Sequence, residues 1–408
     1  MAKVKSFKCV RPKENMAEQV ASLPYDVYDR KEAKAVVRNN PYAFLNIDRP
    51  ETAFGEDFDM YSDKAYERAC DLYNEFKNKG IFIKDGDEAY YLYELTMNGH
   101  SQTGIVGLAS VDDYLFGVIK KHENTRVEKE IDRIKHVDMV NAQTGPIFLA
   151  YRKNDILNDI IEENKKASPI YDFKSSDGVG HRVWKADKKY NDSISENFEK
   201  INSLYIADGH HRAASAVKVA LKRREEKRAK GEYDYFLSVI FDERQLNILP
   251  YNRIAECKGK SKKEILDSIG KNFEILESPV VQEISNKHEF GMLFKDRFFI
   301  LRAKKEILDS TKGDSVKALD VSILQDYILE PVFEIKDPGT DDSIRFAGGI
   351  RGVEYLKAEV SKGDRVAFLM HPTSMEELFA VADEKKLMPP KSTWFEPKLR
   401  SGIFIHEI

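Results

Sequence analysis

A short apolar segment that runs straight into a polar glycine turn constrains the fold of this chain more than any other feature. Residues 203–207 are mostly apolar and have the length of a buried strand. Residues 213–228 are almost all good helix formers. The run Asp208-Gly209-His210-His211-Arg212 between them is therefore a strand-to-helix turn. Because strand-like and helix-like segments alternate along much of the chain, we expect an α/β fold.

The chemistry of this turn suits a phosphate group. The first N–H groups of a helix lack partners within the helix, and the helix dipole favours an anion there. Arg212 adds a fork of donors, and Gly209 lets a ligand approach the backbone closely. A helix-capping Asp208 with incidental histidines would give the same sequence, but four polar side chains around one glycine favour a binding function. Asp208 can also orient a histidine or hold a magnesium-bound water, which makes it the candidate metal contact.

Length and composition limit the classes of protein to which the chain can belong. At 408 residues it is long enough for two or three domains. The formal charge of −4 argues against a protein that binds duplex nucleic acid. No run of about 18 apolar residues predicts a membrane span, and the first ten residues lack the apolar core of a signal peptide. Three widely spaced cysteines fit a reducing compartment, so we expect a cytoplasmic protein.

Periodicity and turn residues predict the other elements and one domain boundary. The polar join at 257–261 separates a predicted domain 1–260 from a smaller α/β domain 261–408. The remaining predictions are helices at 30–40, 65–79, 126–140, 156–166, 262–269, 322–329 and 375–386, strands at 90–95, 146–151 and 366–370, and hairpins that turn at Asn98-Gly99, between 236–241 and 246–250, and at Lys295-Asp296.

Other polar residues are candidates on weaker grounds. Tyr25 and Asp26 stand in a proline turn, where an aspartate is common; the alternative is a carboxylate that lines a site and holds a substrate ammonium group. Asn124 or Thr125 can cap the helix at 126–140, which would leave Glu123 exposed in a capping loop. Two arginines are candidates for contacts with a phosphate or a carboxylate, Arg133 and Arg253.

The turn resembles the D-G-H-H-R signature of the ParB/sulfiredoxin-like superfamily, in its free-serine-kinase branch. Much of the chain is also similar to one prokaryotic family, domain of unknown function 1015. The matching pieces span nearly the full length: Pro24-Tyr25-Asp26-Val27, Asn40-Pro41-Tyr42, His122-Glu123-Asn124-Thr125, Gly145-Pro146-Ile147-Phe148, Tyr205 to Arg212, Leu249-Pro250 with Arg253, and Met388-Pro389-Pro390-Lys391-Ser392-Thr393 with Phe395.

This resemblance implies a kinase that converts free L-serine to O-phosphoserine with ATP or ADP and Mg²⁺. It implies that Glu123 is the base toward the substrate hydroxyl, with Asp208, His210 and His211 beside it in the catalytic site. Nucleotide contacts would come from Gly209, His210, His211, Arg212, Asn124, Thr125 and Arg133, and substrate contacts from Tyr25, Asp26 and Arg253. The expected partners are a nucleotide and a free amino acid, without nucleic acid or membrane, and a homo-oligomer stays open.

Two rival functions remain open, and several motif readings are excluded. A ParB-like nucleotide switch would use the same turn, although no helix-turn-helix is evident. A nuclease would need a cluster of metal-binding carboxylates that the sequence does not display. Lys258-Gly259-Lys260-Ser261 ends like a phosphate-binding P-loop, but Ile254 stands where the first glycine is required. His122-Glu123 lacks the second histidine of a zinc protease, and the turn lacks the cysteine of sulfiredoxins.

Overall fold

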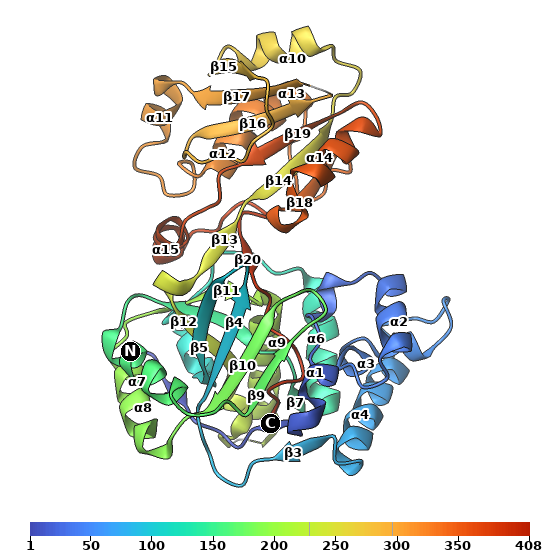
Figure 1. Cartoon of the computed structure of the whole chain (residues 1–408), viewed down its shortest axis with the longest axis vertical. Helices are drawn as coiled ribbons and strands as arrows, with labels where there is room; N and C mark the ends of the chain where they lie inside the picture. The colour runs from blue at the N-terminus through green and yellow to red at the C-terminus, as the bar shows by residue number, and fades with distance from the viewer. Residues whose placement is uncertain (228, 296) are drawn as a thin grey trace. The chain divides into compact units, whose positions relative to one another are not determined.

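The computed structural model describes residues 1–227, 229–295 and 297–408, and these form two compact units (Figure 1). Unit 1 comprises residues 1–246 and 397–408, and unit 2 comprises residues 247–396. The predicted boundary at residue 260 differs from this division. Strand β14 (Tyr251–Glu256) pairs with two strands of unit 2, so the second unit begins before it. Both units mix helices with sheet, which confirms the predicted α/β class.

Unit 1 is built on a mixed nine-stranded sheet in the order β6-β11-β8-β12-β5-β4-β10-β9, with β1 paired to β5. Two small sheets join β2 to β3 and β7 to β21. The strands of unit 1 are β1 (Val4–Lys5), β2 (Val10–Pro12), β3 (Phe82–Lys84), β4 (Tyr91–Met97), β5 (His100–Ser110), β6 (Ile119–Lys120), β7 (Ala142–Gln143), β8 (Ile147–Tyr151), β9 (Tyr171–Lys174), β10 (Gly180–Lys185), β11 (Leu204–Asp208), β12 (Tyr235–Asp242) and β21 (His406–Glu407).

The largest core of unit 1 lies between this sheet and apolar residues from four helices, α5, α7, α8 and α9. A second core joins α4 to the start and the end of the chain. The helices of unit 1 are α1 (Ala17–Val20), α2 (Arg30–Asn39), α3 (Leu45–Asp48), α4 (Asp63–Asn78), α5 (Val111–Leu115), α6 (Val127–Val140), α7 (Asp155–Lys165), α8 (Asn191–Glu199) and α9 (His210–Lys227). None of the helices described in either unit is long and apolar enough to cross a membrane.

Unit 2 holds an antiparallel six-stranded sheet in the order β15-β17-β16-β19-β14-β18, and a separate pair of strands, β13 and β20. Besides β14, its strands are β13 (Asn247–Leu249), β15 (Phe273–Ser278), β16 (Glu289–Phe294), β17 (Arg297–Ala303), β18 (Ile344–Gly348), β19 (Arg365–Met370) and β20 (Trp394–Glu396). Its helices are α10 (Lys262–Ile269), α11 (Lys305–Thr311), α12 (Asp320–Leu324), α13 (Glu330–Phe333), α14 (Gly352–Ser361) and α15 (Met375–Asp383).

Most predicted elements are confirmed, and one hairpin is wrong. The Asn98-Gly99 turn joins β4 to β5, with Met97 opposite His100. The predicted hairpin between 236–241 and 246–250 does not form: β12 pairs with β5 and β8, and β13 pairs with β20. The two segments are adjacent in the sequence and both have a strand-like pattern, which predicted that they pair with each other. Each pairs instead with strands that are distant in the sequence. Two predicted residues lie outside the described residues, Arg228 of the long helix and Asp296 of the β16–β17 turn.

The last twelve residues return to unit 1 after the whole of unit 2. Backbone hydrogen bonds hold this C-terminal segment (397–408) along its length. Ser401 exchanges two such bonds with Ser22, and Ile405 exchanges two with Val10. The N–H of Gly402 donates to the carbonyl of Thr144 at 3.0 Å. Residues 388–395, which carry one piece of the family resemblance, belong to unit 2.

Candidate active site

The phosphate-suited turn has the predicted form, because β11 ends at Asp208 and α9 begins at His210. Gly209 between them has a φ of +94°, which side-chain-bearing residues rarely adopt. A Cβ atom at this position would lie 3.0 Å from Nε and from Nη2 of Arg212. Glycine is therefore needed twice, for the backbone angle and for room beside the arginine.

Arg212 is fixed by groups on both sides of the turn. Its Nη1 donates to the carbonyl of Pro146 at 2.5 Å, and its Nη2 donates to Oδ2 of Asp208 at 3.3 Å. Lys398 of the C-terminal segment also approaches this carboxylate, with its Nζ 3.7 Å from the same Oδ2. Burial favours the neutral form of Asp208, but Lys398 and Arg212 outweigh it and lower its pKa to about 2. The turn thus carries an ionised carboxylate between two cations.

Strand pairing brings the His122-Glu123 segment to the turn. Strands β6 and β11 pair in parallel, with Ile119 opposite Leu204 and Lys120 opposite Tyr205. Because parallel strands end at the same edge, the residues that follow them lie close together. Glu123 and Asp208, 85 positions apart in the chain, thereby reach one site.

The two histidines of the turn hold this loop by accepting hydrogen bonds from its backbone. Nε2 of His211 accepts from the N–H of Arg126 at 2.9 Å, and Nε2 of His210 accepts from the N–H of His122 at 3.5 Å. The ring of His122 meets that of His210 edge-on, with centroids 4.6 Å apart. Both turn histidines therefore fasten the His122-Glu123 loop over the start of α9.

Burial keeps the rings of His122 and His210 neutral, and His210 must be neutral to accept a hydrogen bond. It lowers the pKa of His122 to about 4 and that of His210 well below its ordinary value, and the proximity of each ring to the other adds to the effect at His210. A neutral His210 that accepts at Nε2 carries its hydrogen on Nδ1. This Nδ1 lies 3.8 Å from Oε2 of Glu123, whose side chain is 32% exposed. A carboxylate open to a ligand thus faces a ring that can orient it.

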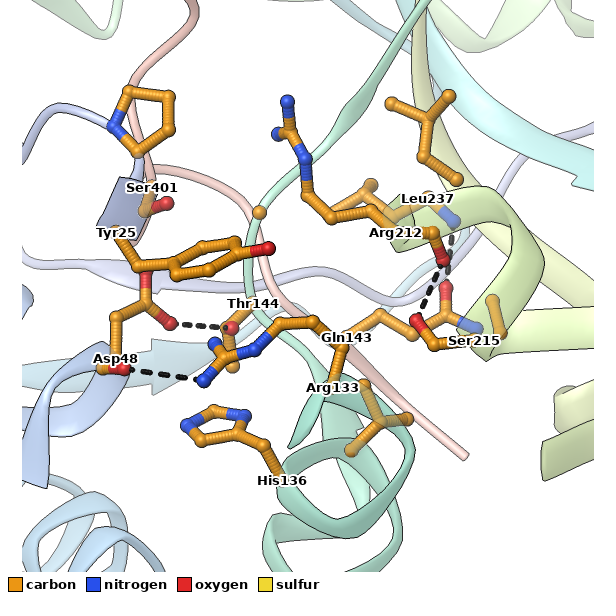
Figure 2. Close-up of a pocket in the computed structure, with 15 residues that line it drawn as sticks. Tyr25, Asp48, Arg133, His136, Gln143, Thr144, Arg212, Ser215, Leu237 and Ser401 are labelled. Atoms are coloured by element: carbon orange, nitrogen blue, oxygen red, sulfur yellow. Dashed lines mark hydrogen bonds between the residues drawn. The ribbon is translucent and has the colours of Figure 1, made fainter. Parts of the chain in front are cut away.

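A pocket opens beside the turn, and Figure 2 shows its polar wall. Tyr25 lies with its ring 4.0 Å from the guanidinium carbon of Arg133. Arg133 is buried and bonds to the carboxylate of Asp132 at 2.9 Å. The carboxylate of Asp48 accepts from the hydroxyl of Thr144 at 3.0 Å. Other lining residues are His136, Gln143, Gly145, Arg212, Ser215 and Ser401. A ligand in this pocket would meet charges of both signs, as an amino-acid zwitterion requires.

The structure brings most predicted site residues together, with two differences. Neither Asn124 nor Thr125 caps α6: Arg126 is the capping residue, and the Thr125 hydroxyl donates to Glu130 instead. The helix begins one residue later than predicted, because the backbone of Arg126 is extended, with a ψ of 128°. Arg253 lies on β14 of unit 2, where it donates to the carbonyls of Tyr251 and Lys391 and lies 5.5 Å from the ring of Phe346.

Among the polar residues of this region that sequence reasoning missed are Asp48, Thr144, Lys398 and Ser401. Thr144 directly precedes the family-like piece Gly145-Pro146-Ile147-Phe148, so its position beside that piece could have marked it as a candidate. The other three stand in segments without a recognisable motif. Asp26, which was predicted, is exposed and lies near enough to His211 that its charge works against the lowering of that ring's pKa by burial.

Comparisons with known proteins give one strong match and several distant ones. A family model described as "Protein of unknown function (DUF1015)" matches residues 4–322. A search of curated proteins gave no match. Among solved structures, SbnI with a C-terminal truncation from Staphylococcus aureus is 11% identical, with a TM-score of 0.38, over 72% of this chain and 85% of that chain. A free serine kinase in complex with AMP is 15% identical, with a TM-score of 0.34, over 72% and 90%. A conserved hypothetical protein from Pyrococcus furiosus is 17% identical, with a TM-score of 0.33, over 73% and 93%. None of these structural likenesses is close enough to transfer a function.

Proposed function

The chain belongs to the DUF1015 family, and for this member we propose a nucleotide-dependent kinase activity toward a free hydroxyl amino acid, with L-serine as the first acceptor to test. The observation that carries the proposal is the pairing of Glu123 with the Asp208–Arg212 turn. One half-exposed carboxylate lies beside a neutral histidine, at a glycine turn that opens a long helix. The assignment of this region to the ParB/sulfiredoxin-like superfamily is part of the same proposal.

The donor phosphates would bind at the start of α9. The N-terminal N–H groups of that 18-residue helix and the Arg212 fork supply donors for an anion. Mg²⁺ would arrive on ATP or ADP as part of the substrate, since it prefers phosphate oxygens and water. Asp208 would be the carboxylate that holds a water of that ion. His210 and His211 would act through position, by keeping the Glu123 loop over the phosphates.

The acceptor would lie between Glu123 and the polar pocket. Phosphoryl transfer needs an oriented nucleophile and a base rather than covalent chemistry by the protein. Glu123 would take the proton of the substrate hydroxyl while the hydroxyl oxygen attacks the terminal phosphorus of the nucleotide. The bond from that phosphorus to the bridging oxygen would break, and the bridging oxygen would leave with the nucleotide. In this pocket the carboxylate of Asp48 can hold an ammonium group, and Tyr25 and Arg133 can meet a carboxylate.

The test is a search for O-phosphoserine by mass spectrometry after incubation of the protein with serine, Mg²⁺ and either ATP or ADP. Glu123→Gln keeps the shape of the side chain but cannot accept the proton. We therefore expect turnover to fall by roughly 10²–10⁴-fold with nucleotide affinity unchanged. The matched control is Glu128→Gln, an exposed carboxylate at the start of α6, which should behave as wild type.

Two results would count against the proposal. If no free hydroxyl amino acid is phosphorylated with any common nucleotide, the kinase activity is wrong, and nucleotide binding without transfer would favour the ParB-like switch. If Glu123→Gln folds and turns over normally, the transfer uses another base.

A further inference from the structure

The C-terminal segment brings a lysine to the proposed phosphate site from outside every recognised motif. Residues 397–408 reach unit 1 only after the 150 residues of unit 2. Their path is fixed close to Lys398, because the buried Arg400 donates from Nη2 to Asp177 and, at 3.1 Å, to Ser175. The two backbone bonds between Ser401 and Ser22 lie one residue further on. Lys398 is therefore held within a few residues of two anchors.

Lys398 shares one carboxylate oxygen with Arg212. Its Nζ lies 3.7 Å from Oδ2 of Asp208, and Nη2 of Arg212 lies 3.3 Å from the same atom. The Lys398 side chain is 16% exposed, so the pair is largely shielded from water. Both cations thus lie beside the turn at the start of α9, where a helix N-terminus also favours an anion.

The two cations differ in their chemistry and in their distance from Asp208. Arg212 is tied to the carbonyl of Pro146 as well as to Asp208, so its guanidinium is set in place. The ammonium of Lys398 stands beyond hydrogen-bond distance from Asp208 and ends a flexible four-carbon stem. An ammonium at the end of such a stem can donate to a phosphate oxygen as a compact point charge.

We propose that Lys398 is a catalytic residue of the transfer, which binds the terminal phosphoryl group of the nucleotide and neutralises its charge as the group moves to the acceptor. In the absence of nucleotide, Asp208 holds it. This role rests on the proposed kinase function, but the binding of phosphate by Lys398 can be measured by itself. The C-terminal segment then completes the site rather than merely covering unit 1.

The experiment compares wild type, Lys398→Gln and Lys398→Arg in calorimetric binding of adenosine, AMP, ADP and ATP, and in the rate of serine phosphorylation. We expect Lys398→Gln to bind ADP and ATP about 10-fold more weakly, with adenosine unaffected, and to lose roughly 10²-fold in kcat. Lys398→Arg should recover most of the binding, because it restores the charge. The matched control is Lys84→Gln. This variant removes a lysine whose Nζ lies 2.8 Å from Glu407, a residue near the opposite end of the C-terminal segment from Lys398, and it should match wild type.

Each outcome separates this proposal from the kinase proposal. If the wild type phosphorylates serine but Lys398→Gln matches Lys84→Gln in rate and binding, the role of Lys398 is overturned and the kinase stands. A loss that is equal for adenosine and ATP shows a structural role only and also overturns it. If no serine is phosphorylated, a loss confined to ADP and ATP still supports Lys398 as a phosphate ligand. Wild-type protein that binds no nucleotide overturns both. Lys398→Met keeps the aliphatic stem and repeats the test should Lys398→Gln fail to fold.

Discussion

Replacing Gly209 by alanine tests whether the geometry of the turn holds Arg212 in place. The φ of +94° carries a strain of about 1–2 kcal/mol for any residue with a Cβ. The new Cβ would lie 3.0 Å from Nη2 of Arg212, so the guanidinium must move. Its bonds to Asp208 and Pro146 would weaken, and for these partly exposed charged partners we assign about 2 kcal/mol in all.

Gly99→Ala is the matched control, because Gly99 has a φ of +80° and no atom within 4 Å of its Cβ position. Both variants should lower the unfolding temperature of unit 1, and Gly209→Ala by about 4–8 °C more, at about 2–4 °C per kcal/mol. Calorimetry should show at least about a 10-fold loss of nucleotide affinity in Gly209→Ala only. Equal unfolding temperatures and unchanged affinity in the two variants would refute the argument that Gly209 gives Arg212 its place.

Two further predictions concern pH and metal. The pKa of His122 is about 4 in the folded protein and near 6.5 when unfolded, so the unfolded state binds more protons between these values and stability falls as the pH drops from 6.5 to 4. His122→Asn should remove about 3 kcal/mol of that fall, seen as flatter urea midpoints between pH 7 and pH 4; an unchanged slope would contradict a buried neutral ring. Among the described residues no group of three or more His, Cys, Asp or Glu side chains could hold a metal ion. Because Mg²⁺ would arrive on the nucleotide, EDTA should stop transfer without changing the unfolding temperature, and a lower unfolding temperature would reveal a structural metal.

Local chemistry explains what the sequence could predict. The turn at 208–212, helix α6 and the Asn98-Gly99 hairpin each depend on residues that are neighbours in the chain, and the structure has all three. The failed hairpin at 236–250 shows the limit of such reasoning. The sequence of an apolar strand does not identify the strand with which it pairs. β12 forms hydrogen bonds along both edges with β5 and β8, whereas the short β13 could pair with only part of one edge.

Resemblance adds which residues matter, but not where they lie. It named Glu123 and the turn together, and the parallel pairing of β6 with β11 supplies the physical reason that they meet. It also named Arg253, which lies in unit 2 with partners of that unit. A motif match reports a residue's identity along the chain, whereas proximity depends on strand order. For that reason Arg253 stays a candidate for a contact with a ligand rather than a member of the described pocket.

The contact between Lys398 and Asp208 could not be predicted from the sequence, for a different reason. The two residues are 190 positions apart, and a whole folded unit lies between them. The segment that carries Lys398 is placed by backbone pairs at Ser22 and Val10, and backbone hydrogen bonds leave no pattern in side-chain identity. The side chain of Arg400 also holds the segment, because it is buried and donates to the carboxylate of Asp177. The sequence does not show that Arg400 is buried. A chain that places a second unit before its last residues can bring those residues back by main-chain pairing, and this route can deliver a side chain to a site without any motif that marks it.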